Sequence, residues 1–432
     1  MDRRELLKSI VTAALATAAP RLADATGSNR ETAALFFVPG YQPQDGRLDG
    51  TPLTQHPAFT SNLPRGYDGP VTLIARLDET DRTVRRALMP IRGHHVAVDP
   101  RGHQAFFSAL DGGQMVRFDP RSLALIDIVK PHAPGFVGGG HAAFTRDGAV
   151  IVTTERRSMS RFAGSAVEHR GRVVIRDGDS MKVIEIHESH GIAPHDLTLM
   201  EAEGLVAVAN YGVTWQADPS LDETRPFRLV EPRLSLIELA SGRLVDELHG
   251  NAFEIRHVAA RDPRHLYAIG ADARPQDEVS RLLVKSGEPS AQNTADGIAY
   301  LPAPVFAVRR DDGPRQEVPI MAKNPFDFRE GQTVVYDPTH DEVIATFASS
   351  DTLAVIDAKS FDLKRVITTP GFGLFAPRGI AFHPDGRRYV VSGSWAGLFF
   401  IARGSHEVDH AATWPELFFN HSHITAVAAP GS

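Results

Sequence analysis

The chain has 432 residues and a formal net charge of -7, with 42% hydrophobic and 23% charged residues. This composition is typical of a soluble globular protein and excludes a disordered one. No run of lysine and arginine is long enough to follow a phosphate backbone, so we expect no nucleic-acid partner. The absence of cysteine excludes disulfides, thiolate metal ligands and covalent haem attachment.

The first 25 residues have the three parts of an export signal. Arg3 and Arg4 lie in a charged start, an apolar stretch runs from Ile10 to Ala19, and an Ala-Asp-Ala tripeptide at 23–25 resembles a cleavage site. The apolar stretch is too short to span a bilayer, and the paired arginines favour the twin-arginine route. We therefore predict a signal over 1–25 and a mature protein in the periplasm, with no membrane span after cleavage.

A repeat fills the remaining residues, 26–432. Each copy has a short apolar strand, a polar turn that often contains Asp-Pro or Asp-Gly, a second strand, a loop and two further strands. Four strands repeating roughly every 40 to 50 residues are the signature of a propeller blade. The clear copies begin at His95, His141 and Gly379, and weaker copies begin near Asp196, Val258 and Thr333.

The two ends of the repeat region are expected to form one blade together. Ala34 to Met89 supplies three convincing strands, and Ile424 to Ala428 is a lone strand at the carboxyl end. Pairing them would hide the exposed edges of an open sheet. We therefore predict an all-β fold: a single, monomeric, seven-bladed β-propeller of four-stranded antiparallel blades, closed by the C-terminal strand. The stretches near 43–69 and 274–331 are predicted to be surface insertions.

Histidine precedes the first apolar strand in five of the seven predicted blades. First strands line the central channel of a propeller, so these imidazoles are expected to converge at one mouth. Imidazole is a common ligand for iron, copper and zinc, and we expect iron or copper here. A structural role, with each ring hydrogen-bonded to the neighbouring blade, stays open as an alternative. The five candidate metal ligands are His95, His141, His195, His257 and His423.

Other side chains are expected at the same mouth, because loops after the second strands return to the face where the first strands begin. They would add carboxylate, amide, guanidinium and aromatic groups around the histidines. No established catalytic motif is present, so the sequence assigns no catalytic residue. The candidate ligand-binding or cofactor-binding residues are Glu155, Asn210, Arg378 and Trp395.

Four runs carry a family resemblance: Gly139-Gly140-His141, Gly191 to Leu197, Ala209 to Val213 and Ile255 to Val258. They are similar to runs in the DUF1513 family, which are exported bacterial proteins of unknown function. Ala142, Asp196 and Tyr211 depart from the family pattern, which has Gly, Glu and Gly there. Family members resemble components of iron-acquisition clusters, so the resemblance implies metal handling and periplasmic iron-uptake proteins as partners.

The leading prediction is therefore a periplasmic propeller that binds iron or copper, or a polar ligand, at a histidine-lined channel mouth, in the context of iron acquisition. Two alternatives remain. One is a scaffold for protein partners, which the fold alone does not exclude. The other is a calcium-dependent hydrolase of the lactonase type, in which Glu155 and Asn210 would help to hold the ion. The sequence leaves open whether the protein is an enzyme.

Overall fold

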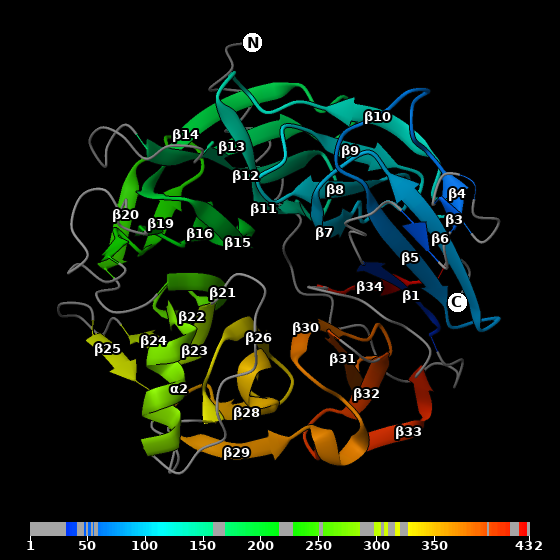
Figure 1. Cartoon of the computed structure of the whole chain (residues 1–432). Helices are drawn as coiled ribbons and strands as arrows, with labels where there is room; N and C mark the ends of the chain where they lie inside the picture. Colours follow the sequence, from blue (N-terminus) through cyan, green and yellow to red (C-terminus); the bar gives the residue numbers. More distant parts are fainter. Residues whose placement is uncertain are drawn as a thin grey trace.

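The computed structural model describes residues 32–40, 47–48, 51–52, 55, 59–158, 169–215, 228–249, 254–285, 298–303, 306–309, 316–319, 327–394, 397–414 and 423–429. Across these ranges, seven antiparallel sheets stand in a ring (Figure 1). The predicted seven-bladed propeller is confirmed. The predicted signal over 1–25 and the candidate residue Trp395 lie outside the described residues. No helix in the described ranges is long and apolar enough to cross a membrane.

The first blade joins the two ends of the chain. Its innermost strand is β34, which pairs antiparallel with β1 so that Thr425 lies opposite Phe37. The predicted closure by the C-terminal strand is therefore confirmed. From the inside outward the sheet contains β34 (Thr425–Ala428), β1 (Ala34–Pro39), β5 (Thr72–Asp78), β6 (Thr83–Met89) and a short parallel strand, β4 (Thr60–Ser61).

The next three blades follow in chain order, and in each of them the first strand is the innermost. The second contains β7 (Gly93–Val98), β8 (Ala105–Ala109), β9 (Met115–Phe118) and β10 (Leu125–Val129). The third contains β11 (Phe136–Phe144), β12 (Val150–Arg157), β13 (Arg170–Asp177) and β14 (Val183–Ile192). The fourth contains β15 (Pro194–Met200), β16 (Leu205–Asn210), β19 (Arg233–Glu238) and β20 (Leu244–His249).

The fifth blade carries the larger excursion. Its four strands are β21 (Glu254–Asp262), β22 (His265–Pro275), β24 (Phe306–Arg309) and β25 (Gln316–Pro319). Between β22 and β24 the chain forms the helix α2 (Gln276–Lys285) and a strand, β23 (Ile298–Leu301), that pairs with the far end of β22. The segment 274–331, predicted as an insertion, therefore holds this excursion and also two strands of the blade itself.

The sixth and seventh blades complete the ring. The sixth contains β26 (Gly331–Asp337), β27 (Glu342–Phe347), β28 (Thr352–Asp357) and β29 (Leu363–Thr368). The seventh contains β30 (Pro377–Phe382), β31 (Arg388–Gly393), β32 (Leu398–Ala402) and β33 (Val408–Trp414). Two short ribbons lie outside the blades: β2 (Arg47–Leu48) with β3 (Thr51–Pro52), and β17 (Val213–Trp215) with β18 (Arg228–Val230).

The hydrophobic core lies between neighbouring sheets. At the closure, Phe36 of the first blade meets Phe400 of the seventh edge-to-face, with ring centroids 5.4 Å apart. Every residue of β1 is buried, because both faces of an internal sheet are covered by neighbouring blades. The burial of these large side chains stabilises the ring and fixes the seven inner strands, β34, β7, β11, β15, β21, β26 and β30, around its centre (Figure 1).

Candidate functional site

The inner strands of blades two to seven share an irregularity near their start. Each shows a register shift against its second strand at this place. A bulge re-aims side chains that a regular strand would alternate between its two faces. Two matched rows of residues result. Regular pairing resumes at the ladder row or at the residue after it, and this row is His95, His141, Asp196, His257, Thr333 and Gly379. The bulge row, one residue earlier, is His94, Gly140, His195, Arg256, Gln332 and Arg378.

Hydroxyl groups on the second strands hold the ladder row. Thr154 Oγ1 accepts the N–H of His141 at 3.4 Å, and Thr346 Oγ1 accepts that of Thr333 at 3.0 Å. Thr154 also donates to the carbonyl oxygen of His195 in the next blade at 2.8 Å. These bonds tie neighbouring blades together at the mouth, so the backbone beneath the histidines is fixed.

The alignment of blades from the sequence is one residue off in the fourth blade. Register places Asp196, and not His195, at the position equivalent to His141 and His257. His195 occupies the bulge row, where His94 of the second blade also lies. The second blade has a histidine in each row, so residue type alone did not show which row holds His195.

All five predicted histidines come together, with His94 as a sixth. His141 lies at the middle of the group and is buried. Its ring centroid is 4.6 Å from that of His95, 4.7 Å from His423, 4.8 Å from His195, 4.9 Å from His257 and 5.3 Å from His94. The expected convergence of imidazoles from different blades is therefore present. We call these six residues the histidine cluster.

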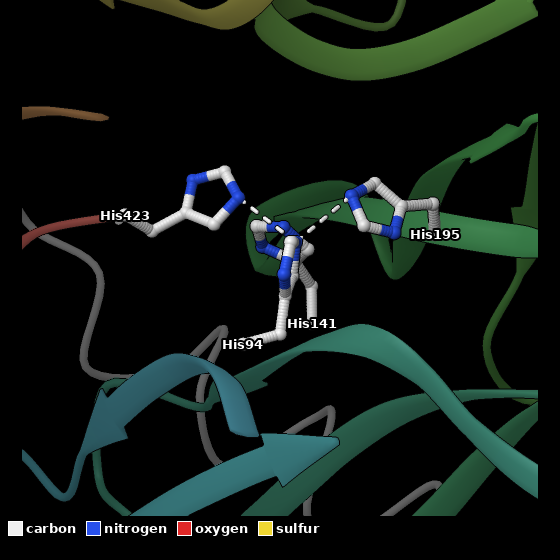
Figure 2. Close-up of side chains that lie close together, drawn as sticks. All are labelled: His94, His141, His195 and His423. Atoms are coloured by element: carbon white, nitrogen blue, oxygen red, sulfur yellow. Dashed lines mark hydrogen bonds between the residues drawn. The ribbon is translucent and has the colours of Figure 1, made fainter. Parts of the chain in front are cut away.

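Four of the rings direct nitrogens at one another. In Figure 2, His423 and His195 approach from opposite sides toward His94, with His141 beside it. His94 Nε2 lies 2.9 Å from His423 Nε2 and 3.2 Å from His195 Nε2. One ring nitrogen from each of these four residues lies within 4.8 Å of the other three. His95 is outside this group and stacks on the face of His141.

The tautomer of His195 follows from its second nitrogen. His195 Nδ1 lies 2.8 Å from the carbonyl oxygen of Gly139. A carbonyl oxygen only accepts, so Nδ1 carries the proton and donates it. In the neutral ring Nε2 then has no proton, and it presents its lone pair to the group.

Asp196 favours the same tautomer in two other rings. Its Oδ1 lies 3.1 Å from His141 Nδ1, and its Oδ2 lies 3.2 Å from His257 Nδ1. A carboxylate oxygen this close to a ring nitrogen favours a proton on that nitrogen, so both contacts favour the tautomer that is protonated at Nδ1 and unprotonated at Nε2. Within the described part of the chain, His141 Nε2 is buried and has no hydrogen-bond partner. A buried lone pair without a partner is costly, so this atom is placed to bind a ligand.

Four imidazoles of the histidine cluster, those of His95, His141, His195 and His423, stay neutral at neutral pH. Burial lowers the pKa of His141, His195 and His423 well below the ordinary value, and the neighbouring imidazoles lower it further. Burial also lowers the pKa of His95 to about 4, against the opposing effect of Asp196. Neutral imidazole is the form that binds metal ions.

These pKa shifts predict that the metal-free protein loses stability in mild acid. Because the folded-state pKa values lie below the unfolded value of 6.5, the stabilisation is complete above pH 6.5. It is lost as the pH falls from 6.5 towards the folded-state values, which for His95 is about 4. One such imidazole is worth about 2 kcal/mol between neutral pH and pH 5. Urea unfolding at pH 7.5 and 5.0 measures this, and His95→Gln should reduce the difference. An equal free energy of unfolding at both pH values would contradict it.

The other predicted residues have their own partners. Glu155 is fully buried and accepts hydrogen bonds from Arg176 and from His132 Nδ1, the latter at 2.7 Å. The Asn210 amide donates to the carbonyl oxygen of Arg233 at 3.0 Å. The Glu155 contacts lie within the third blade and the loop before it, and the Asn210 contact lies within the fourth blade. Arg378 lies in the bulge row, where its Nε donates to Ser394 at 2.6 Å and its Nη2 lies 3.3 Å from Glu330 Oε1.

The sequence also left the roles of several neighbours unassigned. His94 directly precedes the predicted ligand His95, and Asp196 directly follows the predicted ligand His195. These positions were the only signals in the sequence that the two residues belong to the site. Tyr211 packs its ring 4.3 Å from that of His195, and burial raises the pKa of Tyr211, which keeps the phenol protonated. Gly140 adopts a φ of +125°, and an added Cβ would lie 2.5 Å from His195 Nδ1. A side chain at Gly140 would therefore collide with the histidine cluster.

Comparisons with known proteins add the family and the fold. A family model described as "Protein of unknown function (DUF1513)" matches residues 87–374. No curated protein matches the sequence. Among solved structures, hydrazine synthase from Kuenenia stuttgartiensis is similar, with a TM-score of 0.51, 12% identity, and 90% of this chain and 100% of that chain covered. At this identity the likeness shows a shared fold alone.

Proposed function

Because this chain belongs to the DUF1513 family, whose description assigns no activity, we propose a function from the site itself. The protein binds one transition-metal ion, iron or copper, through the imidazoles of His94, His141, His195 and His423. The observation that carries this proposal is the buried, unpartnered lone pair of His141 Nε2 beside the converging nitrogens of the other three rings.

The donor set selects the class of ion. Neutral imidazoles suit iron, copper, zinc and nickel, whereas calcium and magnesium prefer oxygen ligands. Four nitrogens around an ion at about 2.1 Å in a tetrahedron are about 3.4 Å apart. The contacts of 2.9 Å and 3.2 Å at His94 Nε2 are close to this spacing. The calcium alternative has no such support, because Glu155 is engaged by Arg176 and His132.

The groups around the ligands also fit a metal centre. Metal-binding histidines usually donate their second N–H to a carboxylate or a backbone carbonyl, which fixes the ring and strengthens the ligand. Asp196 does this for His141, and the Gly139 carbonyl does it for His195. Both rings are thus oriented with the unprotonated nitrogen inward before any ion arrives.

Equilibrium dialysis followed by elemental analysis tests the proposal. The mature chain, stripped with a chelator, is dialysed separately against Cu(II), Fe(II) and Zn(II). We expect one ion bound per chain and a melting temperature that rises with the concentration of free metal, because an ion that binds only the folded state stabilises it. No metal above the level of a protein blank for any of the three ions would overturn the proposal.

Asp196→Asn tests the contribution of the shared carboxylate. An amide offers one acceptor oxygen where the carboxylate offers two, so His141 and His257 can no longer both donate from Nδ1. We expect metal affinity to fall about 10- to 100-fold, as for other losses of a group that supports a ligand. Competition with a chromophoric chelator measures it. Asp127→Asn, on the exposed outer strand β10, is the control and should bind like the wild type.

For cellular context we propose a periplasmic metal-binding protein that acts with iron-uptake proteins. Arg3 and Arg4 support this, because the twin-arginine route exports folded proteins and would carry a metal centre that is already assembled. Cell fractionation tests the location. The wild type should be recovered with the periplasm, and a chain with Arg3→Lys and Arg4→Lys should stay in the cytoplasm. Recovery of both in the same fraction would contradict export by this route.

A further inference from the structure

The bulge row has histidines in blades two and four and arginines in blades five and seven. Arg256, Gln332 and Arg378 of blades five to seven occupy the positions that His94 and His195 hold in blades two and four. Matched positions in the blades of a propeller lie on a circle around its axis, so these side chains share one mouth. We call Arg256 and Arg378, with their partners Glu254 and Glu330, the arginine side.

Tyr211 joins the two halves of the mouth. Its ring lies 4.3 Å from that of His195 on one side, and the Arg256 guanidinium carbon lies 5.7 Å from its centroid on the other. Arg256 is also 5.1 Å from the ring of Tyr300, whose hydroxyl lies 3.3 Å from its Nη2. Two aromatic rings therefore hold the guanidinium next to the histidine cluster.

Each arginine keeps one nitrogen without a hydrogen bond to the described residues. Arg256 donates Nε and Nη2 to Glu254, while its Nη1 is 4.0 Å from Glu330 Oε1, beyond hydrogen-bond distance. Arg378 donates Nε to Ser394 and Nη2 to Glu330, which leaves Nη1. Nη1 nitrogens in this state are available to an anionic oxygen.

Charge balance favours an anion once the metal is bound. Glu254 and Glu330 match the two arginines, and Asp111 matches Arg156 nearby. Asp196 offsets only one of the two charges of a divalent ion, and the histidine ligands are neutral. One positive charge would remain in a largely buried site, where an unbalanced charge is expensive.

We propose that the metal-loaded centre takes a small carboxylate at the arginine side of the mouth, bound by the Nη1 groups of Arg256 and Arg378. This inference rests on the proposed metal site and names the ligand class of that site. Guanidinium groups recognise carboxylates by geometry as well as charge. The carboxylate is either a free anion that follows the ion or part of a chelate that delivers it.

Calorimetric titration with acetate tests the inference. Acetate is added to the stripped protein and to the Zn(II)-loaded protein, with Zn(II) affinity measured in the same preparations. We expect acetate to bind the loaded form at least about tenfold more tightly than the stripped form. Arg378→Gln should lose about tenfold in acetate affinity while Zn(II) affinity is kept, and Arg378→Lys should recover part of the loss. Arg146→Gln, in the turn after β11, is the exposed control.

The outcomes separate the two proposals. If Zn(II) binds and acetate affinity is the same with and without it, or is unchanged in Arg378→Gln, the carboxylate site is wrong and the metal site stands. If none of Zn(II), Cu(II) and Fe(II) binds the wild type, both fall, and if only Cu(II) or Fe(II) binds, the acetate titration is run on that loaded form with the same two outcomes. The two sources of carboxylate are distinguished by adding the ion as zinc citrate. Citrate retained at one per bound ion indicates a delivered chelate, and zinc retained without citrate indicates a free anion that follows.

Discussion

Replacing His141 and His195 together by Ala should abolish stoichiometric metal binding. The pair removes two of the four converging ligands, including both rings whose inward lone pairs are fixed by Asp196 and by the Gly139 carbonyl. The loss should exceed the roughly 10- to 100-fold expected for a group that only supports a ligand. Dialysis at equimolar Cu(II) or Fe(II) should therefore leave the double variant empty by elemental analysis.

His265→Ala is the matched control for that experiment. His265 is the first residue of β22 and pairs with Asp262, the last residue of β21, five residues along that strand from His257. The His265→Ala variant should bind metal like the wild type. Circular dichroism with urea unfolding checks that the double variant is folded, because the removal of buried rings also leaves cavities. A folded double variant that still binds one ion per chain would show that the ion sits elsewhere.

Gly140→Ala should damage both stability and metal binding. The new Cβ would lie 2.5 Å from His195 Nδ1 and 3.1 Å from His94 Cδ2, so both ligands would be displaced. The φ of +125° adds backbone strain of about 1 to 3 kcal/mol for a residue with a side chain. We expect a lower free energy of unfolding and a metal affinity reduced at least about tenfold, because ligand geometry is sensitive to small displacements.

Gly386→Ala separates these two effects. Gly386 also has a positive φ, of +71°, but an added Cβ would meet no atom within 4 Å. The Gly386→Ala variant should lose stability only because of backbone strain at the positive φ, and it should keep the metal affinity of the wild type. Urea unfolding and chelator competition on both variants give the comparison. Equal metal affinities for Gly140→Ala and Gly386→Ala would contradict the contact between Gly140 and the histidine cluster.

Much of the fold could be predicted because it repeats. The turn residues and apolar strands recur in each blade, and the unpaired strand at the carboxyl end had a natural place beside β1. The strands β24 and β25 were harder to predict from the sequence. They are short, and they lie between stretches rich in glycine, proline and polar residues within a segment predicted as an insertion. Their pairing with β22 is a long-range contact that local composition does not reveal.

The site could be predicted as a set of residues but not as a geometry. Matching strand starts found the five histidines, since their spacing follows the blades. At the bulge of the second blade, His94 takes the place expected for His95. His94 belongs to the four-nitrogen group, and His95 stacks on His141 beside it. Glu155 pairs with Arg176 on the neighbouring strand. Its position in the chain did not reveal that this pairing occupies the carboxylate. Side-chain direction at a bulge depends on local backbone angles.

The coordination of a bound ion is the most direct test of a metal centre built from His94, His141, His195 and His423. X-ray absorption spectroscopy of the copper- or iron-loaded chain counts the ligands and identifies imidazole rings by their outer-atom scattering. We predict a first shell of four nitrogens at about 2.0 to 2.1 Å, all from imidazole. A shell made mainly of oxygen, or one with a single imidazole, would contradict the four-histidine centre.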